Sequence, residues 1–264
     1  MRRKSNHVKF LGTAGARFVM LRQLRSSAGT WLSLNGTNVL IDPGPGTLVR
    51  CVTSRPRLNP TTLDAIAISH KHLDHANDVN VMIEAMTDGG FKRRGTLLCP
   101  GDALFSDDPV VMKYLRSHLD KIKVFEEGGS HNVQGIKIST PKRHVHSVET
   151  YGLEFGLRGK NEPLISFITD TKYFEGLEDV YHGRILVINV VRYEMRAGVD
   201  HLCVKDVEKI IKTRQPELVV LTHFGMTMLR NKPHEIAKKL SEKTGVNVIA
   251  AHDGMLLDLD PYLE

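Results

Sequence analysis

The sequence predicts an α/β protein in which two β-sheets pack face to face and helices cover their outer sides. Three observations support this: short β-rich runs come first, strand and helix patterns alternate after them, and no linker, repeat or low-complexity tract divides the 264 residues. Because nothing in the chain marks a boundary, we expect one domain over residues 1–264.

Glycines punctuate the first third of the chain, and the runs between them have strand character. Asn35-Gly36 stands between two apolar runs and is a dipeptide typical of a two-residue hairpin turn. We expect strands over residues 8–13, 31–35, 38–42 and 65–69, followed by a helix over 79–86.

The rest of the chain alternates between strand and helix patterns. In the last third, apolar residues recur at positions 204, 207, 210 and 211, which is the spacing of one helical face. We expect strands over 97–99, 121–125, 136–140, 151–158, 164–169, 185–189, 218–222 and 246–250, and helices over 109–118, 204–213 and 233–243.

Composition excludes several classes of protein. The chain is 41% hydrophobic and 25% charged, as is ordinary for a globular protein, and no apolar run approaches the roughly 18 residues of a membrane span. Three scattered cysteines without a CxxC pair predict no disulfide framework. We read no export signal at the basic start and therefore expect a cytoplasmic protein without a membrane partner. The net charge of +6 favours an anionic substrate.

The run His70-Lys71-His72-Leu73-Asp74-His75 follows a predicted strand and indicates a metal site. Imidazole nitrogens and carboxylate oxygens are ligands for zinc and its first-row neighbours. His70 and His72 can project from one side of an extended segment, whereas Asp74 and His75 come after a turn and face a second point. With 13 histidines in the chain, this pattern arises by chance on the order of once per several hundred chains. One run cannot complete two sites, so more ligands are expected elsewhere.

Further candidate ligands follow other predicted strands, where loops on a rigid scaffold commonly carry functional residues. Each alone would more simply be a structural or surface residue, but their repeated position at strand ends favours function. They are His144, His146, Asp170, His223, His252 and Asp253, and the roles of His144, His252 and Asp253 stay open.

These residues resemble the pattern of the metallo-β-lactamase superfamily, and within it the chain looks most like the ribonuclease Z-type phosphodiesterases. The resemblance begins at Leu11-Gly12-Thr13 and extends nearly to the C-terminus. Tyr151-Gly152, five residues after His146, favours His146 over His144 as the third ligand. The other segments that carry the resemblance are Ser69 to His75, Leu40 to Thr47, Phe167 to Thr171 and Leu221 to Phe224.

The resemblance implies a four-layer αββα sandwich that holds two divalent transition-metal ions. Zinc is the expected metal, and manganese and iron suit the same ligands. Asp42 is expected to orient a ligand histidine from behind, and Asp74 counts among the catalytic residues as well as the ligands. By this resemblance the first site is His70, His72 and His146, the second is Asp74, His75 and His223, and Asp170 bridges the two.

His201 is the expected proton donor, because ribonuclease Z-like enzymes carry such a histidine 22 residues before the last ligand. Its alternative role is to cap the helix that follows. Two departures argue against pre-tRNA as the substrate. His146 and Asp170 are only 24 residues apart, too close for an RNA-gripping arm, and Leu202-Cys203 replaces the usual sequence after His201.

We therefore expect a metal-dependent hydrolase in which a hydroxide bridging the metals attacks a nucleotide or nucleic-acid phosphodiester. Lys142, Arg143 or Arg192 would hold the anion. Two alternatives remain: a lactone, carboxylic-ester or thioester hydrolase with the same metal cage, and a non-catalytic metal-binding protein. RNA as a partner and a homodimer are further expectations.

Overall fold

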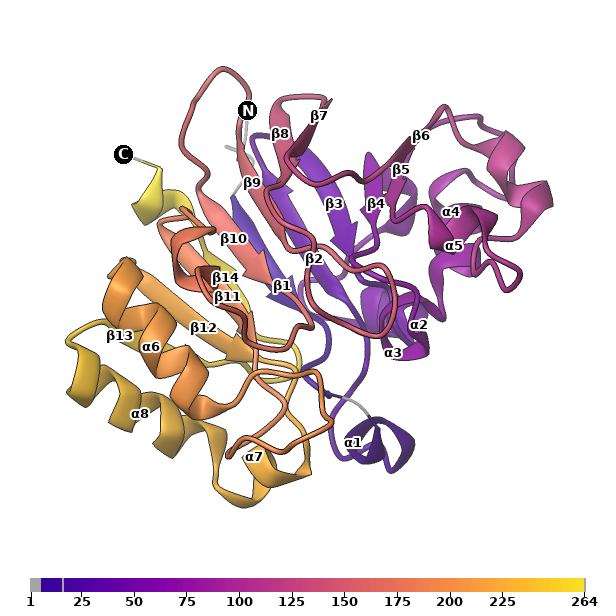
Figure 1. Ribbon diagram of the computed structural model, residues 1–264. Coiled ribbons are helices and arrows are strands. Elements are labelled where there is room, and N and C mark those ends of the chain that lie inside the picture. The colour runs from indigo at the N-terminus through magenta and orange to yellow at the C-terminus, as the bar shows by residue number, and fades with distance from the viewer. Residues whose placement is uncertain (1–5, 16, 264) are drawn as a thin grey trace.

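Two seven-stranded sheets form the centre of the protein, as the computed structural model in Figure 1 shows. The structure describes residues 6–15 and 17–263. In the first sheet the strands lie in the order β14 (Leu256–Asp258), β1 (His7–Phe10), β2 (Thr30–Leu34), β3 (Thr37–Ile41), β4 (Ala65–Ala67), β5 (Thr96–Cys99) and β6 (Lys121–Val124).

The second sheet mirrors the first in its mixture of strand directions. Its order is β13 (Asn247–Ala250), β12 (Leu218–Thr222), β11 (Ile185–Asn189), β10 (Ile165–Ile168), β9 (Leu153–Leu157), β8 (Ile136–Thr140) and β7 (Gly129–Val133). Pairing is antiparallel from β14 to β3 and parallel from β3 to β6. It is parallel from β13 to β10 and antiparallel from β10 to β7.

Helices cover the outer side of each sheet, which confirms the predicted four-layer sandwich. Over the first sheet lie α2 (Thr47–Thr53), α3 (Leu73–Ala76), α4 (Val79–Met86), α5 (Asp102–Phe105) and the 3-10 turns Pro60–Thr62 and Lys113–His118. The second sheet is covered chiefly by α6 (Val204–Arg214) and α8 (Pro233–Thr244), with α7 (Met226–Arg230) and the turn Leu177–Asp179 beside them. The other helical segments are α1 (Phe18–Leu21) and the turn Asp260–Tyr262.

Apolar packing occurs in three layers. The layer between the sheets includes Phe10, Phe155 and Phe167, whose side chains project from the inner faces. Trp31 and Met82 belong to the layer under the first set of helices. A third layer joins the second sheet to α6 and α8. Three buried interfaces of this kind hold the strand ends in fixed positions.

The predicted hairpin is confirmed, because Asn35 and Gly36 both have positive φ (50° and 75°) between β2 and β3. The helix predicted over 109–118 is wrong in its first half. Residues 109–112 are not helical, since the N–H groups of Val110 and Val111 bond to the carbonyl of Ala103 in α5. Only the 3-10 turn Lys113–His118 remains. The other predicted strands and helices are present, with ends that differ by a few residues.

Within the described residues no helix is both long and apolar enough to cross a membrane. Cys51, Cys99 and Cys203 are all buried and free, as the spacing of the cysteines predicts.

Candidate metal centre

The first cluster consists of His70, His72 and His146, which come from two loops. His70 and His72 follow β4, and His146 lies in the loop between β8 and β9. One ligand atom from each lies within 4.8 Å of the others, and Nε2 of His146 is 3.1 Å from Nδ1 of His72. Three imidazole nitrogens that converge in this way match a first-row metal site.

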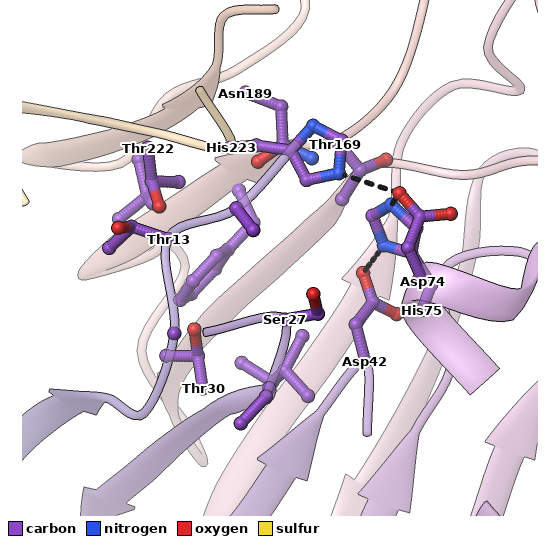
Figure 2. Close-up of a pocket in the computed structure, with 17 residues that line it drawn as sticks. Thr13, Ser27, Thr30, Asp42, Asp74, His75, Thr169, Asn189, Thr222 and His223 are labelled. Atoms are coloured by element: carbon purple, nitrogen blue, oxygen red, sulfur yellow. Dashed lines mark hydrogen bonds and ion pairs between the residues drawn. The ribbon is translucent and has the colours of Figure 1, made fainter. Parts of the chain in front are cut away.

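The second cluster consists of Asp74, His75, Asp170 and His223. The first two lie on the short helix α3, and the others follow β10 and β12. Nε2 of His223 is 3.3 Å from Oδ2 of Asp74, and Nε2 of His75 is 3.6 Å from the same oxygen. Figure 2 shows the His223 and His75 rings converging on Asp74.

Asp170 belongs to the second cluster and lies on its side toward the first. Its Oδ2 is 3.9 Å from Nε2 of His70 in the first cluster and 3.5 Å from Nε2 of His75 in the second. The amide of Asn189 donates to its Oδ1 at 2.9 Å and fixes the carboxylate plane. This is the position that a bridging carboxylate requires.

Several buried ring nitrogens of the clusters have no hydrogen-bond partner among the described residues. They include Nε2 of His70, Nε2 of His75 and Nδ1 of His223. An unpaired buried polar atom costs free energy, and a bound cation would satisfy it. With two carboxylates beside them, the donors fit a pair of divalent transition metals. These buried His/Asp clusters therefore form a metal-binding centre suited to two ions.

Asp42 holds the His75 ring from behind. It follows β3 with a positive φ of 49°, a conformation that aspartate tolerates better than most residues. Its Oδ1 accepts from the backbone N–H of Ser69 at 2.6 Å, and its Oδ2 accepts from the Ser69 hydroxyl at 2.7 Å and lies 2.9 Å from Nδ1 of His75. The carboxylate thus places the Nδ1 proton of His75 on its own side and leaves Nε2 free for a metal.

The charges of the cluster are strongly coupled. Burial lowers the pKa of His70 well below its usual value and also lowers the pKa of His72. Burial acts against the charge on His75 too, but Asp74, Asp170 and Asp42 outweigh it and hold that pKa well above its usual value. Burial opposes ionisation of Asp74, yet chiefly the His75 and His223 rings hold its pKa at about 2. Without metals, these carboxylates therefore favour the protonated form of His75.

His201 lies beside the Asp170 carboxylate, which also contacts histidines of both clusters. Its Nδ1 is 3.5 Å from Oδ2 of Asp170, and its ring centre is 5.3 Å from that of His146. Burial is the main reason why its pKa is lowered. The alternative role as a helix cap is excluded by geometry, because Cys203 is the N-cap of α6 and pairs with Asp206 in a capping box.

The remaining candidates have other contacts. His144 is buried: its Nδ1–H donates to the Asp170 carbonyl at 3.2 Å, its Nε2 pairs with the Tyr181 hydroxyl, and burial lowers its pKa to about 4. Asp253 accepts from the Thr13 hydroxyl and from the Ser26 N–H, both at 2.7 Å, whereas His252 is exposed. His144 and Asp253 thus support the loops rather than the clusters.

Of the three cations expected to hold an anion, Lys142 is already paired with another side chain. Lys142 pairs with the exposed Glu127 at 2.6 Å, and the backbone N–H of Arg143 bonds to the same carboxylate. Arg192 is different, because its backbone N–H bonds to Leu202, next to His201, and its buried Nε has no partner in the described chain.

Sequence reasoning missed the roles of Ser69, Asn189 and Tyr181. Asn189 ends β11, between the strand that leads to Asp170 and the strand that leads to His223. A polar residue at the end of an otherwise apolar strand was the signal that could have found it. Tyr181 is fully buried and far from any motif, so no pattern pointed to it.

Comparisons with known proteins agree with this geometry. Residues 37–224 match the family model described as "Beta-lactamase superfamily domain". The chain is 31% identical to the uncharacterised protein MJ1374 of Methanocaldococcus jannaschii over 95% of this chain and 94% of that one. It is 35% identical to a ribonuclease Z of Kineococcus radiotolerans, over only 35% of this chain and 28% of that protein.

Solved structures share the fold. The metallo-β-lactamase fold protein YhfI of Bacillus subtilis matches with a TM-score of 0.77, covering 97% of this chain and all of that chain at 16% identity. A diphosphatase of the PhnP family matches with a TM-score of 0.69, covering 96% of each chain at 18% identity. At such identities the likeness concerns the fold alone.

Proposed function

The chain belongs to the metallo-β-lactamase superfamily, and we propose that it is a two-metal phosphodiesterase acting on a nucleotide or nucleic-acid phosphodiester. The coarser statement, a metal-dependent hydrolase fold with a His/Asp metal-binding centre, rests on the family match and on the two clusters. The finer statement rests on His201.

The position of His201 is the observation that carries the proposal. Its ring borders both clusters, with its centre 5.3 Å from that of His146 and 6.4 Å from that of His223, and its side chain is 15% exposed. Because Nδ1 faces Asp170, the opposite nitrogen, Nε2, is the one left to meet a substrate. An imidazole in this place can protonate the departing oxygen of a phosphodiester.

Two divalent metals bound at the clusters would polarise the phosphoryl group and activate a water molecule for attack. The protein's own residues do the rest. Asp42 and Asn189 fix the orientation of the His75 ring and of the Asp170 carboxylate. Asp170 in turn stabilises a proton on His201. Arg192, whose backbone N–H bonds beside His201 and whose buried Nε has no partner among the described residues, is the cation that we expect to face the negative charge of the substrate.

Charge and relatives add support. The net charge of +6 favours an anionic substrate. A protein called ribonuclease Z and a structure called a diphosphatase, both named for phosphorus–oxygen bond cleavage, are among the similar proteins. Zinc is the metal we propose, on the ligand types alone.

The second candidate is a lactone, ester or thioester hydrolase. The lowered pKa of His201 favours this second candidate, because burial leaves the His201 ring neutral in most molecules at pH 7. A lactone keeps its leaving alkoxide tethered to the product and depends less on a proton donor.

Turnover of a phosphodiester, a lactone and a thioester by the metal-loaded protein and by His201→Ala tests the proposal. We expect phosphodiester cleavage by the wild type, reduced about a hundredfold to ten-thousandfold in the variant, as general acid catalysis generally contributes. His252→Ala is the matched control, because that histidine also follows a strand but is exposed, and its ring bonds within the described residues only to the Asp253 carbonyl.

Three results would count against the proposal. Lactone or thioester turnover that exceeds phosphodiester turnover and is unaffected by His201→Ala supports the second candidate. Turnover of none of the three substrates supports a non-catalytic metal-binding protein. Phosphodiester turnover that is equal in the wild type and in His201→Ala removes the assigned role of His201.

A further inference from the structure

A small cavity with polar and apolar groups in its walls lies between the two sheets, behind the second cluster (Figure 2). Asp42, Asp74, His75 and His223 form the wall toward the metal centre. The residues that line it are all buried or half-buried. The opposite walls carry hydroxyl and amide groups, which Figure 2 labels as Thr13, Ser27, Thr30, Thr169, Asn189 and Thr222.

Several polar groups in the walls opposite the metal centre have no protein partner within the described chain. The Ser27 hydroxyl is the clearest case, because the residue is 4% exposed and its buried Oγ makes no hydrogen bond. Among residues 6–15 and 17–263, no side-chain hydrogen bond involves the hydroxyls of Thr30 and Thr222, and Asn189 uses only its amide nitrogen, toward Asp170. Buried polar groups of this kind are normally paired with protein or with ordered water.

Close backbone approaches build the cavity into the fold. A Cβ at Gly44 would lie 2.1 Å from the carbonyl oxygen of Asp74 and 2.2 Å from that of Ser27. A Cβ at Gly29 would lie 2.4 Å from the carbonyl oxygen of Ile41. Because these glycines admit no side chain, the segments that surround the cavity stay in contact and cannot shift to fill it.

We propose that this cavity is a hydration site whose ordered water molecules support the second metal position. The space in which the centre of a water molecule fits is about 50 Å³, which is room for about three to five waters at roughly 10–15 Å³ each. A buried water needs two to four polar partners, and Ser27, Thr30, Thr222 and Asn189 supply them. Water held there also reaches the wall formed by Asp74 and His223.

The consequence is a difference between the two metal positions. Residues behind metal ligands commonly change metal affinity by 10-fold to 100-fold when they are altered. Only Asp74, His75 and His223 border the cavity, whereas His70, His72 and His146 do not. Loss of the hydration site is therefore expected to weaken the second metal and leave the first unchanged.

The first test is a high-resolution crystal structure of the metal-loaded protein. We expect at least two ordered waters in the cavity, each bonded to two or more of Ser27, Thr30, Thr222 and Asn189. A dry cavity would overturn the proposal. A density peak with several oxygens at 2.3–2.6 Å would also overturn it, because that geometry is typical of a bound cation.

The second test is Thr222→Val, which removes one hydroxyl from the wall and keeps the shape of the side chain. Stepwise titration with zinc is expected to show affinity for the second ion reduced about tenfold, with the first unchanged. Thr37→Val is the matched control, since Thr37 is buried at the opposite end of β3 and binds Gly135. Wild-type affinity for both ions in Thr222→Val contradicts the proposal. Neither readout depends on the substrate, so both remain informative if the phosphodiesterase assignment fails.

Discussion

Asp42→Asn should weaken metal binding at the second position without unfolding the protein. Asparagine matches aspartate in size and tolerates the positive φ of 49° at this position. The carboxylate accepts from the Ser69 N–H and hydroxyl and lies 2.9 Å from Nδ1 of His75. An amide has only one acceptor oxygen. If that oxygen stays on the Ser69 N–H, the NH2 group faces Nδ1 and forces the His75 proton onto Nε2, where a metal should bind.

The loss is that of one hydrogen bond to a charged group, about 1.5–3 kcal/mol. At about 1.4 kcal/mol per factor of ten, this corresponds to a tenfold to hundredfold lower affinity for the second metal. The assay is competition for zinc against a chromophoric chelator. Asp64→Asn is the matched control. The Asp64 carboxylate also accepts a backbone N–H, that of Asn38, but it lies away from the clusters, beside Arg94. Unchanged affinity in Asp42→Asn would refute the role assigned to this carboxylate.

Four further outcomes follow from contacts at the second cluster, behind it and in the core between the sheets. In the metal-free protein the raised pKa of His75 stabilises the fold below about pH 6.5, its unfolded value, and this contribution is lost as pH rises through the folded value. A metal that binds Nε2 of His75 must displace the proton there. Calorimetry in buffers of different ionisation enthalpy should therefore show proton release at neutral pH and a metal affinity that rises with pH. Absence of proton release would contradict the raised pKa of His75. Tyr181→Phe leaves the buried Nε2 of His144 without its partner and should cost about 1–3 kcal/mol of unfolding free energy in urea, whereas an unchanged midpoint would exclude that contact. Phe155→Ala, between the sheets, should cost about 3–5 kcal/mol, and a loss below about 1 kcal/mol would mean that the intersheet layer is not tightly packed there.

Much of the fold could be predicted from local patterns. β8, β11 and β12 and the helix α4 are found where the apolar runs place them, because each is packed on a core that selects its hydrophobic side chains. β7 (Gly129–Val133) and β14 (Leu256–Asp258) were missed. Both are edge strands with exposed polar residues, and only pairing with β8 and β1 makes them strands.

The order of strands within each sheet lay outside such reasoning. β1 pairs with β14, whose residues are more than 240 positions away, through contacts that no local period records. The helix predicted over 109–118 was wrong for a related reason. A tertiary bond to Ala103 replaced the local helical bonds of residues 110 and 111.

The site was more predictable than the topology, because metal ligands are conspicuous residue types. The structure brings together all seven predicted ligands, with His201 beside them. It also separates His144 from His146, as the spacing that favoured His146 for the third ligand predicts. The groups behind the ligands, Ser69 and Asn189 among them, and the cavity depend on backbone approaches that sequence does not encode locally.

Stoichiometric metal reconstitution tests the central claim most directly. Protein stripped by a chelator and titrated with zinc is assayed with bis(p-nitrophenyl) phosphate after each addition. A two-metal phosphodiesterase predicts no turnover in the stripped protein and recovery that reaches its maximum as the second equivalent binds. Full turnover without metal, or complete recovery after one equivalent, would contradict the account.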